Sequence, residues 1–358
     1  MTRVITSTSP QKPSDVVLES PALTAPEVAQ AVLRARAAQK AWSENAMARA
    51  AALRGCAEGL RARSAEMAAL ITREVGKPIV EAKGEVARAI AILDYNAQAA
   101  IDPIGTVIPP TTPGYLMAVR EPYGVAGLAD VISFTGSSEV GSQIVAQAAK
   151  CGKPVQAEMG GQNPAIILPD ADLALTVAHL SNASMSFAGQ KCTATSRIII
   201  VGDDSRYKEV TEALVAGVEK LAPNDPATEG VLVGPVISDS ARTDVESAAK
   251  GAVARGGKVL TGGAPVDRDG WFYSPTLIAD LGPEDPFNQE ETFGPIAGVI
   301  RAKSVGDAID SANAVRFGLT GSVHGRDLEA TIRVAQSLRT GMVKVNAPTA
   351  GLDFHAPV

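Results

Sequence analysis

Residues 186–197 read SFAGQKCTATSR and lead directly into the apolar run 198–201, and the cysteine in this stretch is the most informative residue of the chain. A thiol in a turn that also contains Gly189, Gln190 and Lys191 is expected to be partly exposed and able to ionise. Only the thiolate is a good nucleophile, and nearby positive charge or free backbone N–H groups lower the pKa of a thiol. Cys192 is therefore the candidate nucleophile.

A second block, EMGGQNP at residues 158–164, supplies a carboxylate. A glutamate followed by two glycines can be held against close backbone and can activate a water molecule. Together, a thiol and such a carboxylate indicate covalent catalysis at a carbonyl, with Cys192 attacking and Glu158 later delivering water. The alternative for Glu158 is an ordinary carboxylate at the end of a strand, and Asn163 and Pro164 are expected to be structural.

Two further blocks follow the same order, FTGSSEVG at residues 134–141 and ETFGP at residues 291–295. With all four blocks, the chain resembles the aldehyde dehydrogenase superfamily from about Pro26 almost to its end. The resemblance implies an α/β fold, with a dinucleotide-binding domain and an α/β catalytic domain that has a largely parallel sheet. It also implies NAD or NADP as cofactor, a small aldehyde as substrate and a homo-oligomer.

The resemblance assigns roles to six residues. Cys192 would form a thioester after a hydride leaves for the nicotinamide, and Glu158 would activate the water that hydrolyses it. Gly136 and Ser137 would contact the cofactor phosphate and nicotinamide, and Glu291 and Phe293 would hold the nicotinamide ribose. The alternatives are a strand-to-helix turn for Gly136 and Ser137, a loop glutamate for Glu291 and a core side chain for Phe293.

The string NAPTAGLDFHAP at residues 346–357 is similar to the 2-oxoglutarate semialdehyde (2,5-dioxopentanoate) dehydrogenase branch of this superfamily. That similarity implies a short aldehyde that carries a carboxylate or derives from a sugar acid. Substrates in the superfamily are varied, so the string indicates a class of aldehyde and not one compound.

The chain departs from the superfamily between residues 124–128 and 131–135. In the superfamily these two segments correspond to separate parallel strands of the dinucleotide fold, yet here only Ala129 and Asp130 lie between them. Neighbouring parallel strands need a crossover of about a dozen residues or more. The two segments therefore form one strand, or one of them is displaced. The missing block includes the superfamily's oxyanion-hole asparagine and its ribose-binding lysine, and a C-terminal strand is missing as well.

Three functions follow from these observations. The first is NAD(P)-dependent aldehyde oxidation that is impaired by the internal deletion. The second is ester hydrolysis by Cys192 and Glu158 without cofactor. The third is a non-catalytic fragment that contributes only packing or subunit contacts.

Composition narrows the possible partners and locations. The formal net charge is −6, which argues against nucleic acid or an anionic membrane as a partner. Three cysteines with no metal-ligand spacing, and three scattered histidines, predict neither a disulfide framework nor a metal site. The start of the chain lacks the apolar stretch of a signal peptide, so a cytoplasmic location is expected. Cys56 and Cys151 are expected to be small buried side chains.

Hydrophobic periodicity and capping signals place the secondary structure. Residues before Pro21 are expected to be irregular, and residues 104–108 and 115–119 are expected to pair as an arm of two strands. We expect a dinucleotide-binding portion with helices and arm at 1–158, a catalytic domain at 159–346 and a C-terminal segment at 347–358. Helices are predicted near residues 24–40, 46–63, 64–75, 79–100, 171–188, 205–221, 240–255, 304–313 and 327–339, and strands near 197–201, 258–260, 296–300, 320–324 and 342–345.

Overall fold

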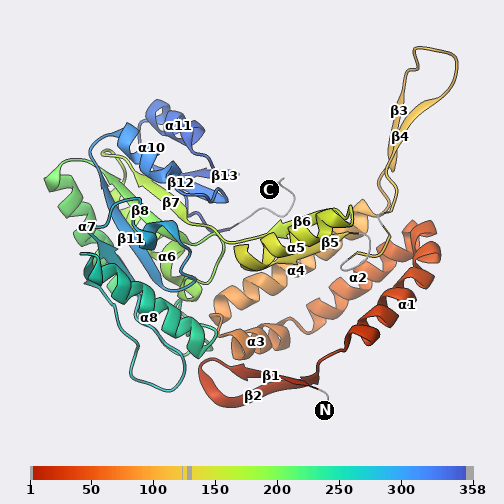
Figure 1. Cartoon of the computed structure of the whole chain (residues 1–358), viewed down its shortest axis with the longest axis horizontal. Coiled ribbons are helices and arrows are strands. Elements are labelled where there is room, and N and C mark those ends of the chain that lie inside the picture. Colours follow the sequence, from red (N-terminus) through yellow and green to blue (C-terminus); the bar gives the residue numbers. More distant parts are fainter. Residues whose placement is uncertain (1–2, 123, 127–130, 352–358) are drawn as a thin grey trace. The chain divides into compact units, whose positions relative to one another are not determined.

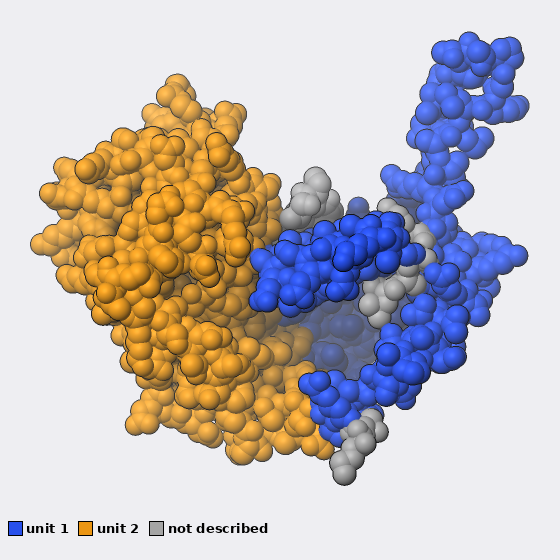
Figure 2. All heavy atoms as spheres, in the orientation of Figure 1, with its two compact units in different colours: residues 1–5, 20–67, 83–159 blue, residues 6–19, 68–82, 160–358 orange. Residues whose placement is uncertain are grey.

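The computed structural model describes residues 3–122, 124–126 and 131–351 (Figure 1). The chain divides into two compact units, coloured separately in Figure 2. Unit 1 comprises residues 1–5, 20–67 and 83–159, and unit 2 comprises residues 6–19, 68–82 and 160–358. Two short N-terminal segments therefore belong to the same unit as the C-terminal half of the chain.

Unit 2 is built around a seven-stranded sheet in the order β13-β12-β7-β8-β11-β10-β9. Neighbouring strands are parallel throughout, except that β9 runs antiparallel to β10. The prediction of an α/β fold with a largely parallel sheet is confirmed. The strands are β7 (Asn163–Ile167), β8 (Thr195–Val201), β9 (Lys258–Thr261), β10 (Thr276–Ala279), β11 (Ile296–Ala302), β12 (Thr320–His324) and β13 (Met342–Val345).

Both faces of this sheet are buried, which explains the continuous apolar run at residues 198–201. Ile198 and Ile200 pack into one core together with the helices α6 (Leu173–Met185) and α7 (Asp204–Glu219). Ile199 and Val201 point to the opposite face, where they pack with α10 (Val305–Asn313) and α11 (Leu328–Ser337). Alternate side chains of one strand therefore serve two separate cores.

The helices of unit 2 begin where the sequence places a capping residue. The side chains of Asp172, Asp203, Ser238, Ser304 and Asp327 each accept a hydrogen bond from a backbone N–H in the first turn of a helix. Such caps satisfy N–H groups that the helix itself leaves unpaired. The predicted helices are confirmed with small shifts at their ends, and α8 (Asp239–Ala254) and α9 (Pro286–Gln289) complete the set that the structure describes in this unit.

Unit 1 contains helices, a two-stranded arm and a small parallel sheet. At the start of the first helix, the Glu27 carboxylate accepts a hydrogen bond from the Thr24 backbone N–H at 2.7 Å, as the predicted capping box requires. The arm pairs β3 (Gly105–Ile108) with β4 (Leu116–Val119) as predicted, and all eight residues are exposed. The other elements are α1 (Ala25–Glu44), α2 (Ala46–Ala62), β5 (Ile132–Thr135), α5 (Ser138–Lys150) and β6 (Val155–Glu158), with α3 (Ser64–Val75) and α4 (Ile79–Ala99) shared between the units.

The part of unit 1 that the sequence predicts to bind a dinucleotide is small. Among the described residues it consists of the parallel pair β5 and β6 joined through α5. Of the predicted strand at 124–128, only residues 124–126 are described, and there Ala126 forms an isolated parallel bridge with Val131. The junction at Ala129 and Asp130 lies outside the described residues.

The prediction of an irregular N-terminus is wrong, because β1 (Val4–Ser9) and β2 (Lys12–Pro21) form a hairpin. Long-range contacts within unit 2 hold its tip. The Trp271 backbone N–H donates to the Pro10 carbonyl at 3.0 Å, and the Arg73 guanidinium pairs with both oxygens of Asp15 at 2.6 and 2.9 Å. The Ser-, Thr- and Pro-rich composition predicts a loop here, but these contacts with distant residues stabilise two strands.

Candidate active site

The predicted nucleophile lies at the amino-terminal edge of the sheet of unit 2. Cys192 precedes β8, Gly161 precedes β7, and the segment 291–294 precedes β11. Because these three strands are parallel neighbours, their amino ends lie side by side. The sheet therefore gathers three of the sequence blocks at one edge.

An unusual backbone conformation precedes Cys192. Phe187, Ala188 and Gly189 have φ angles of 55°, 53° and 66°, all in the left-handed region. Left-handed geometry costs roughly 1–2 kcal/mol for each residue that has a Cβ. At Gly189 an added Cβ would overlap the carbonyl oxygen of Gly294. This strained turn persists because surrounding contacts fix it.

Gln190 is one of the side chains that fix the turn. Its Nε2 donates to the carbonyls of Phe187 and Pro235, both at 3.2 Å, and its Oε1 accepts the Ile237 N–H at 2.8 Å. The side chain is buried, so each of these bonds replaces one that water would otherwise make. The glutamine of the GQKCT block therefore has a structural role.

Asn163 fixes the other side of Cys192. Its Nδ2 donates to the carbonyl of Cys192 at 2.7 Å and to the carbonyl of Ala194 at 2.8 Å. Its backbone N–H donates to the Ser196 hydroxyl at 3.0 Å. These bonds connect β7 to the residues just before β8, in accord with the structural role predicted for Asn163.

Thr349 also contacts this turn, which the sequence did not predict. Its hydroxyl donates to the Thr193 carbonyl at 2.7 Å and lies 2.8 Å from the Thr195 hydroxyl. The side chain is fully buried, and Lys344 donates to the nearby carbonyls of Ala350 and Gly351. The only sequence signal was the similarity of this segment to one branch of the superfamily.

Glu291 lies against the two glycines that follow Glu158 in the sequence. Its Oε1 accepts the Gly161 N–H at 3.0 Å, and an added Cβ at Gly160 would overlap its carboxylate. Burial raises the pKa of Glu291 above its ordinary value of 4.5, partly offset by the Gly161 hydrogen bond.

We expect Glu291→Gln to stabilise the protein at neutral pH by a small amount. The pKa of Glu291 is higher in the folded state than in the unfolded state. Ionisation of this carboxyl therefore lowers the free energy of unfolding as the pH rises above the ordinary pKa of a glutamate, and this loss is absent at lower pH. Glutamine stays neutral and can still accept the Gly161 N–H. Urea unfolding at pH 7.5 should give Glu291→Gln a higher free energy of unfolding than the unmodified protein, and this difference should be smaller at pH 4. Glu284→Gln, an exposed position in the same loop, is the control, and a gain equal at both pH values would contradict the prediction.

A hollow of about 430 Å³ lies beside Glu291 and Phe293 in unit 2. Helix α8 contributes the small side chains Ala241 and Ala248 to its lining. Phe293 is 46% exposed, so it is not the core side chain that was the alternative to a binding role. The hollow therefore presents an aromatic ring and a half-buried carboxylate to one small space.

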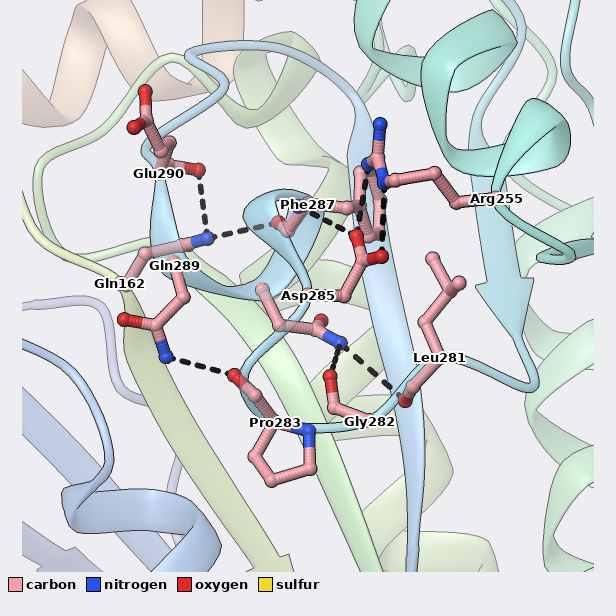
Figure 3. Close-up of polar contacts among 10 residues, drawn as sticks. Gln162, Arg255, Leu281, Gly282, Pro283, Asp285, Phe287, Gln289 and Glu290 are labelled. Atoms are coloured by element: carbon pink, nitrogen blue, oxygen red, sulfur yellow. Dashed lines mark hydrogen bonds and ion pairs between the residues drawn. The ribbon is translucent and has the colours of Figure 1, made fainter.

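A hydrogen-bonded loop at residues 281–290 immediately precedes Glu291 in the chain, and Figure 3 shows its polar contacts. Gln162 donates to the carbonyls of Phe287 at 3.1 Å and Glu290 at 2.8 Å. Arg255 holds both oxygens of Asp285 at 2.8 and 2.9 Å, just before α9. Gln162 connects the loop to the start of β7, a function that its place between Gly161 and Asn163 did not reveal.

The other predicted site residues lie together in unit 1. Thr135 of β5 pairs with Glu158 of β6, and the Gly136 N–H donates to the Glu158 carbonyl at 3.0 Å. The Ser137 hydroxyl accepts the Val140 N–H at 3.3 Å and caps α5. The Glu158 side chain is exposed, and its Oε1 accepts from Gln156 at 3.3 Å. Gly136, Ser137 and Glu158 thus form one set, and Cys192, Glu291 and Phe293 form another in unit 2.

No disulfide joins Cys56, Cys151 and Cys192, and all three side chains are exposed, so the expectation that Cys56 and Cys151 are buried is wrong. His324 is 1% exposed and burial lowers its pKa to about 4, with the nearby His179 ring adding to the shift.

In the described ranges no cluster of potential metal ligands occurs, and no helix there is long and apolar enough to cross a membrane.

Arg197, in β8, is the largest fully buried side chain, and sequence reasoning did not single it out. Its guanidinium donates to the carbonyls of Gln162, Ser311 and Ala312 at 2.7–3.0 Å. Burial lowers the pKa of Arg197 to about 10. This one side chain joins the residue before β7 to the end of α10.

Comparison with known proteins places these features in a family. The aldehyde dehydrogenase family model matches residues 2–130 and 128–358, two segments that meet where the sequence lacks a crossover. Alpha-ketoglutaric semialdehyde dehydrogenase of Bacillus subtilis is 29% identical over 429 residues, covering 98% of this chain and 87% of the relative. That alignment is longer than the 358-residue chain, so the relative has residues with no counterpart here.

Two further proteins support the same placement. Succinate-semialdehyde dehydrogenase [NADP(+)] of Deinococcus radiodurans is 30% identical, covering 94% of this chain and 85% of the relative. The crystal structure of betaine aldehyde dehydrogenase from Staphylococcus aureus in complex with NAD+ has a TM-score of 0.94 at 26% identity, covering 99% of this chain and 86% of that one. The chain therefore belongs to the aldehyde dehydrogenase family of oxidoreductases.

Proposed function

We propose that this protein oxidises a short semialdehyde to a carboxylic acid through a thioester on Cys192. The observation that carries the proposal is an exposed thiol at the end of a strained turn that hydrogen bonds of Asn163 and Gln190 hold in place. Strain of this kind clusters at active sites and ligand-binding sites. An exposed cysteine without a role needs no such turn.

The residues of the chain divide the reaction between them. The Cys192 thiolate adds to the aldehyde carbon and leaves an oxyanion, which re-forms the carbonyl of a thioester when the adduct loses a hydride. After oxidation of this adduct to a thioester, Glu158 removes a proton from water, which attacks the thioester carbonyl and releases the acid and the thiol. The exposed carboxylate of Glu158 is suited to contact solvent water.

The residues in unit 2 fit the nicotinamide riboside half of NAD or NADP. Glu291 offers carboxylate oxygens to ribose hydroxyls, and the exposed Phe293 ring offers an apolar contact beside the hollow. When bound, this cofactor supplies the acceptor for the hydride. Gly136 and Ser137 are proposed to contact it from unit 1, although the Ser137 hydroxyl already caps α5.

The substrate proposed is an aldehyde with a carboxylate at its other end, such as 2-oxoglutarate semialdehyde. The names of the relatives support this class, because they include alpha-ketoglutaric, succinate and glutarate semialdehyde dehydrogenases. The rate is proposed to be low. Losing one side-chain oxyanion donor costs about 3–4 kcal/mol in the transition state, and the missing block includes that donor.

The test is the absorbance of reduced nicotinamide after protein that melts cooperatively is mixed with 2-oxoglutarate semialdehyde and NAD+ or NADP+. We expect slow reduction that Cys192→Ala abolishes and Cys56→Ala leaves unchanged. Both substitutions remove an exposed thiol, so the comparison separates the nucleophile from general thiol chemistry. Oxidation that survives Cys192→Ala would refute the assignment.

A second candidate is hydrolysis of activated esters without cofactor. Two observations favour it. The turn that leads to Cys192 is held by hydrogen bonds, whereas the part proposed to bind the dinucleotide has only two described strands, β5 and β6. Cleavage of p-nitrophenyl acetate that is independent of NAD+ and NADP+, and lost in Glu158→Gln, would support it. No cleavage by a folded sample would exclude it.

A further inference from the structure

The hollow beside Glu291 carries an excess of negative charge. Its lining contains one cation, Arg255, and the three carboxylates of Asp244, Glu290 and Glu291. The Arg255 guanidinium is already paired with both oxygens of Asp285, at 2.8 and 2.9 Å (Figure 3). Because this pair cancels the charge of Arg255, three carboxylates line one space of about 430 Å³ without a cation to balance them there.

These carboxylates are available to a ligand. Asp244 lies on α8 and Glu290 lies in the loop before β11, and both side chains are exposed. Within the part of the chain that the structure describes, neither carboxylate forms an ion pair. Glu291 accepts one backbone N–H, from Gly161, and a carboxylate can accept several hydrogen bonds. A positively charged ligand would therefore interact favourably with all three side chains.

The hollow also offers an aromatic surface. Phe293 is 46% exposed and lines the same space. The face of an aromatic ring attracts cations, and a second flat ring can stack against it in an offset arrangement. Pockets that hold small molecules typically have volumes of about 300–1,000 Å³, and the volume of this hollow falls within that range. Charge, ring and volume together favour a small ligand with a flat, positively charged ring.

We propose that Asp244 and Glu290 make this hollow selective for the oxidised nicotinamide ring over the reduced one. The oxidised ring is a pyridinium with one positive charge, whereas the reduced ring has gained a hydride and is neutral. Opposite charges near a protein surface attract one another over several ångströms, and salt weakens this attraction. The hollow therefore binds the form that accepts a hydride more tightly than the form that has received it. This inference rests on the proposed function, because it concerns the cofactor of the same site.

The competing explanation is that Asp244 and Glu290 are ordinary solvated charges. Exposed carboxylates often contribute little to binding or stability, because water and salt screen them. In that case the oxidised and reduced rings would bind equally well, and replacing either carboxylate would leave both affinities unchanged. The two explanations therefore differ in the ratio of two affinities, measured with ligands of nearly the same shape.

The test is titration of the full chain with nicotinamide riboside and with its reduced form, dihydronicotinamide riboside, monitored by NMR of the ligands. We expect the oxidised riboside to bind about threefold to tenfold more tightly at low salt. Asp244→Asn and Glu290→Gln should each lower this ratio about twofold to threefold, and added salt should lower it as well. Glu284→Gln is the control, because it removes an exposed carboxylate of the same loop that does not line the hollow, and it should leave the ratio unchanged.

Three results would overturn the proposal. They are equal affinities for the two ribosides, a ratio that Asp244→Asn and Glu290→Gln both leave unchanged, and no binding of the oxidised riboside by protein that melts cooperatively. Binding of a riboside needs neither Cys192 nor turnover, so it can be measured even if the chain oxidises no aldehyde. Failure of the proposed oxidation and failure of the charge selectivity are thus separate observations.

Discussion

Replacing Arg197 with methionine is expected to lower the free energy of unfolding by about 3–5 kcal/mol. The guanidinium is fully buried, and its acceptors are the backbone carbonyls of Gln162, Ser311 and Ala312. A buried ion pair can often be exchanged for apolar side chains at little cost, because both partners can be replaced. Backbone carbonyls cannot be replaced, so methionine would leave three buried acceptors without a donor.

Urea unfolding monitored by circular dichroism measures this effect. The matched control is Arg333→Met, which removes an exposed arginine whose described partner is Glu329 on the same helix. Exposed i,i+4 pairs of this kind contribute about 0.3–0.5 kcal/mol. If Arg197→Met and Arg333→Met lower the free energy of unfolding equally, the buried hydrogen bonds of Arg197 do not contribute more to stability than an exposed ion pair.

Gly189→Ala is expected to destabilise unit 2 by about 3 kcal/mol or more, and to suppress every reaction of Cys192. Two effects combine at this position. The φ of 66° is unfavourable for any residue with a Cβ, and the added carbon would overlap the Gly294 carbonyl oxygen. Because Gly294 precedes β11 in the central sheet, its backbone cannot move away easily.

Gly230→Ala separates these two effects. Gly230 also has a positive φ, of 84°, but an added Cβ there would meet no atom within 4 Å. Its replacement should therefore cost only the backbone term, about 1–2 kcal/mol. Thermal and urea unfolding measure how much each variant is destabilised. The destabilisation by Gly189→Ala minus that by Gly230→Ala is the energetic cost of the overlap with Gly294. If Gly189→Ala costs no more than Gly230→Ala, the close approach to Gly294 has no energetic weight.

Much of the fold could be predicted because local signals agreed with it. The Thr24–Glu27 capping box, the arm with its proline-rich turn and the run at residues 198–201 each have a local cause, and all three are confirmed. Strand β7 was not predicted, and it contains Pro164 although proline is disfavoured inside a central strand. The register with β8 shifts at that residue, which accommodates it.

The site could be predicted only where sequence blocks mark it. The blocks identify Cys192 and Glu291, but not the side chains that hold them in place. Gln162, Arg197 and Thr349 are ordinary polar residues in the sequence, and their roles depend on partners 29 to 156 positions away. The hairpin of β1 and β2 was missed for the same reason.

The contacts of Thr349 have a consequence for how the protein folds. Thr349 bonds to residues 154 and 156 positions earlier, and Asn163 accepts a bond from Thr320, 157 positions later. Closing loops of this length costs chain entropy before the contacts compensate for it, so such topologies fold slowly. The environment of Cys192 is therefore completed only when distant parts of the chain have met. Until then the thiol belongs to an incompletely folded polypeptide, and since it is also exposed in the folded protein, a reducing agent is needed both during and after refolding to preserve it.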